Sequence, residues 1–135
     1  MSSLQYIYLY LCTVPVFFLI DMVWLGVVAK GFYQQHLGSF IGPINRPAAI
    51  IFYLIFIIGI IIFAVAPALE TQSLIKAVVL GALFGLFTYA TYDLTNLATL
   101  KDWPLIVVFV DIVWGMVLSG SVAAVSFIIS RALFF

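Results

Sequence analysis

Three aspartates lie inside long apolar segments of this 135-residue chain, and they are the side chains best placed to do chemistry. Asp21 lies nine residues before Lys30. Asp93 lies eight residues before Lys101, and Asp111 lies ten residues after it. Acids inside a membrane segment are costly, so they usually face the bundle interior and mark a path for protons, ions or substrates. The spacing therefore predicts a polar site within a membrane protein.

The composition assigns the chain to the bilayer. Apolar residues make up 67% of the sequence and charged residues 7%, whereas soluble domains contain about 45–50% and about 25%. The formal net charge is zero, which leaves no basic surface for nucleic acid. The single cysteine, Cys12, lies in an apolar run and is interpreted as a buried structural residue.

Four segments are long enough to cross a hydrocarbon core, which takes about 20 apolar residues. The first segment has no basic region or cleavage site before it, so we expect it to remain as a spanning helix. The sequence therefore predicts one all-α domain over 1–135, an integral membrane four-helix bundle with both termini on the same side. The spans are predicted at about 4–29, 48–69, 77–100 and 103–130.

Helix-capping residues indicate where two of these spans begin. Asn45 is a natural N-cap for the second span, with Pro47 in its first turn. Asp102 is the corresponding prediction for the fourth span, with Pro104 in its first turn. Because only Lys101 and Asp102 separate the third and fourth spans, these two helices should be antiparallel neighbours.

The connection over 31–45 predicts a short interfacial helix. Its role is either an anchor at the membrane surface or a lid over a cavity that opens on the same face. His36 and Tyr33 are the candidate lid or entrance residues, and a headgroup-level histidine is the alternative reading of His36. Apolar residues recur along the segment at helical spacing: Tyr33, Leu37, Phe40, Ile41 and Ile44.

The positive charges do not select an orientation. Lys30, Arg46 and Lys101 lie on one side, and Lys76, Arg131 and the amino terminus lie on the other. The excess of basic residues that normally marks cytoplasmic loops is therefore missing. A fixed topology set by other features and dual insertion both remain open.

The depth of the aspartates can be counted from the flanking lysines. At about 1.5 Å per residue, each carboxyl lies roughly 12–15 Å from one face of a core about 30 Å thick. Three unpaired aspartates would cost about 10 kcal/mol to insert. We therefore expect at least one protonated carboxyl at neutral pH, or a bound cation among them, and we predict no other cofactor and assign no metal. The nearby polar partners include Asn96, Tyr89, Trp24 and Trp114, and none is cationic.

Helical phase brings these groups onto packing faces. Tyr89, Asp93 and Asn96 share a face of the third span, and Gly81 and Gly85 form a GxxxG pattern before them. A face of small or polar residues on the fourth span carries Asp111, Gly115, Ser119 and Ser126.

The first and fourth spans also share an Asp-x-Val-Trp element. It runs from Asp21 to Trp24 and again from Asp111 to Trp114, in helices that cross the membrane in opposite directions. Inverted pairs of this kind occur in transporters built from inverted repeats. Chance repetition in so apolar a chain is the alternative.

Four stretches resemble a known family: DMVWLG over 21–26, GFY over 31–33, TYATYDLTNLATLKDWP over 88–104 and DIVWG over 111–115. They are similar to the bacterial multi-pass membrane family catalogued as domain of unknown function 2177. The resemblance covers nearly the whole chain. It implies a four-helix protein of the bacterial cytoplasmic membrane, and it implies no activity.

Three functions fit these observations. The first is a binding or carrier protein in which the aspartates take up a proton, a cation or a small cationic solute. The second is a lipid-modifying enzyme or its accessory subunit, against which stands the lack of a histidine cluster, a nucleophile motif and a phosphate loop. The third is a structural role in which the acids are interhelical hydrogen-bond partners. The partners are the bilayer and a small solute or lipid, and the uncharged second span faces either lipid or a second copy in a homodimer.

Overall fold

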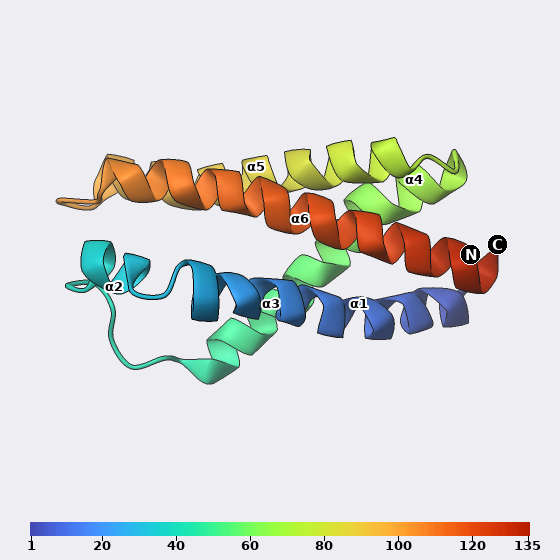
Figure 1. Ribbon diagram of the computed structural model, residues 1–135, viewed down its shortest axis with the longest axis horizontal. Helices are drawn as coiled ribbons and strands as arrows, with labels where there is room; N and C mark the ends of the chain where they lie inside the picture. The colour runs from blue at the N-terminus through green and yellow to red at the C-terminus, as the bar shows by residue number, and fades with distance from the viewer.

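A computed structural model describes residues 1–135 and consists of helices joined by short connections (Figure 1). Four of its helical segments are long and apolar enough to cross a membrane, which confirms the predicted all-α membrane bundle. Their ends agree with the predicted spans to within about one helical turn. The four candidate spans are Ser3–Val28, Arg46–Glu70, Leu74–Thr99 and Leu105–Phe134.

The first span is α1 (Ser3–Val23) followed by the π-helical turn η1 (Trp24–Val28). A capping box starts α1: the Ser2 hydroxyl accepts from the Gln5 N–H at 3.2 Å, and the Gln5 side chain accepts from the Ser2 N–H at 2.9 Å. In η1 the N–H of Ala29 donates to the Trp24 carbonyl at 2.7 Å, five residues back. This wider turn ends the span.

The second span consists of α3 (Arg46–Ile60), the π-helical turn η2 (Ile61–Val65) and α4 (Ala66–Glu70). The Asn45 side chain accepts from the Ala48 N–H at 3.2 Å, so the predicted N-cap is confirmed.

The third and fourth spans, α5 (Leu74–Thr99) and α6 (Leu105–Phe134), pack along each other as the closest pair in the bundle. Glycines allow this approach. A Cβ on Gly85 would lie 2.0 Å from the Gly115 carbonyl oxygen, and one on Gly81 would lie 2.6 Å from the Ser119 carbonyl oxygen. The GxxxG pattern of α5 is therefore a helix-packing site, as predicted.

One local prediction is wrong. Asp102 does not cap α6, because it adopts a left-handed conformation with φ of 61° in the tight turn, and Pro104 occupies the N-cap position. The short helix predicted within the segment 31–45 is present as α2 (Phe32–Leu37). Its Leu37 packs against Trp103 and Val107 at the start of the fourth span.

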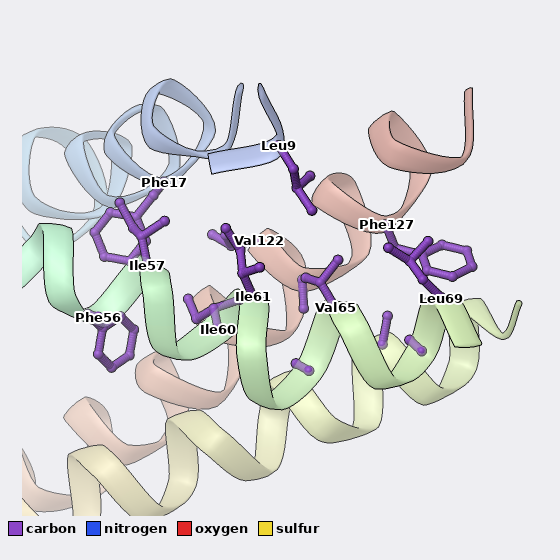
Figure 2. Packing of buried hydrophobic residues seen from close by; sticks show 14 of the residues in the cluster. Leu9, Phe17, Phe56, Ile57, Ile60, Ile61, Val65, Leu69, Val122 and Phe127 are labelled. Carbon is purple, nitrogen blue, oxygen red and sulfur yellow. The ribbon is translucent and has the colours of Figure 1, made fainter. Parts of the chain in front are cut away.

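The apolar core lies in the half of the bundle that contains the two termini. Phe17 from α1, Ile57 and Ile60 from α3, and Val122 from α6 meet there with little or no exposed surface (Figure 2).

The opposite half is less tightly packed. In Figure 1, α3 runs obliquely to the other three spans, whereas α1, α5 and α6 lie roughly along one axis. The end of the second span, η2 and α4, packs against α5 and α6, and α3 contacts α1. The first turns of α3 therefore diverge from α5. All three intramembrane aspartates lie in or at the edge of this half.

Candidate functional site

Two stacked tryptophans mark the crossing of the first and fourth spans. The rings of Trp24 and Trp114 are 4.5 Å apart between centroids and 8° from parallel. The Trp114 indole N–H donates to Oδ1 of Asp21 at 3.3 Å. The two Asp-x-Val-Trp elements therefore meet face to face.

Tyr33 links the first Asp-x-Val-Trp element to the second, because its hydroxyl lies between Trp24 and Asp111. Its hydroxyl donates to Oδ1 of Asp111 at 2.5 Å and accepts from the Trp24 indole N–H at 3.1 Å. Burial, followed by the hydrogen bond to Asp111, raises the pKa of the Tyr33 hydroxyl above its ordinary value. The hydroxyl therefore remains protonated and acts as a donor to the carboxylate.

The three aspartates are not equally close to one another. Asp93 and Asp111 act on each other, whereas neither is among the groups that act on Asp21. No group of three or more potential metal ligands forms. That the three acids share one depth in the membrane stays a prediction.

Asp93 and Asp111 form a close pair. The side chain of Asp93 has no exposed surface and approaches the Asp111 carboxyl and the Trp103 indole. None of these approaches has the distance and angles of a hydrogen bond, so both Asp93 oxygens and the Trp103 N–H lack a partner. No lysine or arginine acts on any of the three acids. The pair thus holds two acidic groups without a compensating positive charge.

An aromatic cavity of about 440 Å³ leads to this pair between α3 and α5. Asp111 is its only acidic lining residue, and Ala49 and Thr88 also line it. Its volume is within the range of about 300–1,000 Å³ typical of ligand sites. Five aromatic side chains form most of its wall: Phe52, Tyr53, Phe56, Tyr89 and Tyr92.

Comparison with known families identifies the chain. The family model described as "Predicted membrane protein (DUF2177)" matches residues 6–128. The chain belongs to this family. Comparisons with curated proteins and with solved structures gave no match. Membership of the DUF2177 family agrees with the four candidate spans, and it brings no known activity to the site.

In this DUF2177 chain, Tyr89 is the most central of the predicted site residues outside the acids. Its ring lies against Gly115, where a Cβ would be 2.3 Å from the Tyr89 Cγ. Its hydroxyl is within electrostatic range of all three aspartates. Replacing Gly115 by any larger residue would therefore displace the Tyr89 ring, whose hydroxyl lies near all three aspartates.

Two predicted residues lie apart from the acids. Asn96 is half-buried, approaches the Tyr92 hydroxyl and makes no hydrogen bond to an aspartate. The His36 ring packs on Phe32, and its Nδ1 lies 2.9 Å from the Phe32 carbonyl oxygen. Of the two candidate lid residues, only Tyr33 contacts an aspartate.

Sequence reasoning missed two polar neighbours of the acids. Trp103 was taken as the first residue of a span, yet it lies in the turn before α6 and directs its indole toward Asp93. The Tyr53 hydroxyl approaches the Asp21 carboxyl from α3. The only signal for either residue is its type, an aromatic ring with a polar atom, because neither is close in the sequence to the intramembrane aspartate that it approaches.

Proposed function

We propose that this protein binds and carries a cation, in the simplest case a proton, at the Asp93–Asp111 pair within the membrane. The observation that carries the proposal is the completely buried Asp93 carboxyl, which faces a second carboxyl and has no hydrogen-bond donor. By family resemblance, the membrane is the bacterial cytoplasmic membrane.

Charge balance supports this role. Two neighbouring carboxylates in an apolar medium repel each other, so one proton or one other cation between them is strongly favoured. A shared proton would also give one of the two unpartnered Asp93 oxygens a hydrogen bond to Asp111. Because no lysine or arginine supplies a fixed positive charge, the pair must take up a mobile proton or other cation. Such a pair is suited to binding and releasing that cation.

For Asp21 we propose a structural role. Its carboxyl accepts from the Trp114 indole N–H, and neither Asp93 nor Asp111 is among the groups that act on it. An asparagine at position 21 could accept the same hydrogen bond through its amide oxygen. The two kinds of aspartate therefore differ in a way that a single substitution can separate.

The test is infrared spectroscopy of the reconstituted protein across pH, which detects protonated carboxyl groups directly. We expect a carboxyl band at neutral pH that disappears in Asp93→Asn and in Asp111→Asn, because each change removes one member of the pair. In vesicles that contain a pH-sensitive dye, the same variants should lose proton uptake.

Asp21→Asn is the matched control, since it also replaces a buried intramembrane aspartate by its isosteric amide. It should retain both the band and the uptake, and so should Asp102→Asn in the exposed turn. Ionised carboxylates at neutral pH in the unmodified protein, with no change of signal in the pair variants, would overturn the proposal.

A further inference from the structure

The aromatic cavity opens sideways, toward the bilayer. Phe52 and Tyr92, which line it, keep 52% and 54% of their surface exposed. Tyr92 lies seven residues from the end of α5 and Phe52 six residues from the start of α3. The opening is therefore about 9–10 Å inside the ends of these helices, at a depth where lipid chains surround the bundle.

The lining combines aromatic rings with one carboxylate. Aromatic faces attract cations electrostatically, and the attraction is larger where water is excluded. Asp111 is the only charged side chain in the lining, so the cavity favours a positively charged occupant. A neutral apolar occupant would leave this carboxylate without a counter-charge.

The same lining is poorly suited to a bare inorganic ion. Calcium and magnesium ions are held by six or more oxygens. The Thr88 hydroxyl is already used, because it donates to the Phe84 carbonyl of its own helix at 2.8 Å. Most of the remaining wall is aromatic carbon. The cavity therefore offers one acid and many ring faces, which is the chemistry that recognises quaternary and protonated amines.

We propose that the cavity binds an organic cation with an apolar body, such as a substituted ammonium ion, which enters from the bilayer between α3 and α5. The inference rests on the proposed function, because the ammonium charge would replace the proton held by the Asp93–Asp111 pair. The exchange balances: one proton leaves the pair as one monovalent cation arrives, so the two carboxyl groups together with their bound cation keep a net charge of −1.

The first experiment compares two probes of nearly equal shape, benzyltrimethylammonium and its uncharged carbon isostere neopentylbenzene, in protein-loaded and empty lipid nanodiscs. All three tryptophans of the chain lie near the acids, so intrinsic fluorescence reports binding. We expect saturable binding of the cation with release of about one proton, and binding of the isostere at least about tenfold weaker. Equal binding of both probes would overturn the inference and indicate a lipid-chain pocket, as a lipid-modifying enzyme would need.

The second experiment removes one wall of the cavity without altering the acids. Phe52→Leu deletes a ring at the opening, and Phe63→Leu deletes a similarly exposed ring of the same span outside the cavity. Phe52→Leu should weaken binding of benzyltrimethylammonium about tenfold, and Phe63→Leu should leave it unchanged. Equal effects of the two variants would contradict the assigned cavity.

The acid itself provides the remaining comparison. Asp111→Asn should reduce binding of benzyltrimethylammonium by at least roughly thirtyfold, because it removes the buried counter-charge. A pair that shows a shared proton by infrared spectroscopy but does not bind the organic cation would overturn this inference and leave the proposed function standing. Binding of the cation without proton release, in a protein that shows no protonated carboxyl, would instead contradict the proposed function.

Discussion

Tyr33 is the residue that joins the connection between the first two spans to the intramembrane acids. Its hydroxyl is simultaneously a donor to Asp111 and an acceptor from Trp24. The Trp24 ring in turn stacks on Trp114, which donates to Asp21. Removing the hydroxyl would leave a buried carboxylate without its donor and an indole N–H without its acceptor. The Tyr33 hydroxyl therefore adds a polar attachment to the apolar contacts by which Leu37 holds α2 against the start of the fourth span.

We expect Tyr33→Phe to reduce the free energy of unfolding by roughly 1–3 kcal/mol, because hydrogen bonds to charged groups are among the stronger ones. Denaturant titration in detergent, followed by tryptophan fluorescence, measures this change. Tyr8→Phe is the control, since the Tyr8 side chain is exposed on α1. Its effect should be within about 0.5 kcal/mol. A similar result for Tyr33→Phe would show that the hydroxyl does not hold the connection in place.

At the scale of the helices, hydropathy and small residues predicted which segments span the membrane and how α5 and α6 pack. The regular pattern of apolar residues needs no distant partner, so it can be read locally. The two π-helical turns could not be predicted, because η1 and η2 replace regular helix within continuous apolar runs. The N-cap assignment of Asp102 failed because the short turn takes Asp102 into a left-handed conformation. The tight connection overrode the usual capping preference.

The close approach of α5 and α6 predicts a position-specific effect of alanine. Gly85→Ala should destabilise the bundle by about 1–3 kcal/mol, because its Cβ would overlap the backbone of Gly115 and separate the helices. Gly120→Ala is the matched control in the same interface, since its nearest neighbour would lie at 3.4 Å, an ordinary contact. Thermal unfolding in detergent would distinguish them. Equal melting temperatures for the two variants would contradict the packing.

For the molecule as a whole, the sequence predicted the three acids and some of their neighbours, such as Trp114, but it did not predict Trp103, Tyr53 or the cavity. Asp93 and Asp111 were found because a charge in an apolar run is conspicuous by itself. The cavity depends on the oblique path of α3 relative to α5, which brings Phe52 and Tyr53 toward Tyr89. The angles between helices are set by contacts between segments that are far apart in the sequence. An apolar span without charged residues gives no local signal of which helices it will contact.

The arrangement of the four spans also makes a prediction about orientation. Both termini lie at the same end of the bundle (Figure 1). The basic residues are balanced between its two ends, with Lys30, Arg46 and Lys101 in the connections at one end and Lys76, Arg131 and the amino terminus at the other. Two lysines added to the first connection, Gln35→Lys with Ser39→Lys, should therefore be enough to fix that connection on the cytoplasmic side.

The readout is labelling of intact cells by a membrane-impermeant maleimide at Gln72→Cys, in a background that carries Cys12→Ser. We expect full labelling of this position from outside, because the turn that contains Gln72 lies at the end opposite the first connection. The control pair Gln35→Glu with Ser39→Glu should change the labelling little, since acidic residues contribute weakly to orientation. Labelling of Gln72→Cys only from the cytoplasmic side in the lysine variant would contradict this prediction, because the single span between the two connections places Gln72 on the face opposite the added lysines.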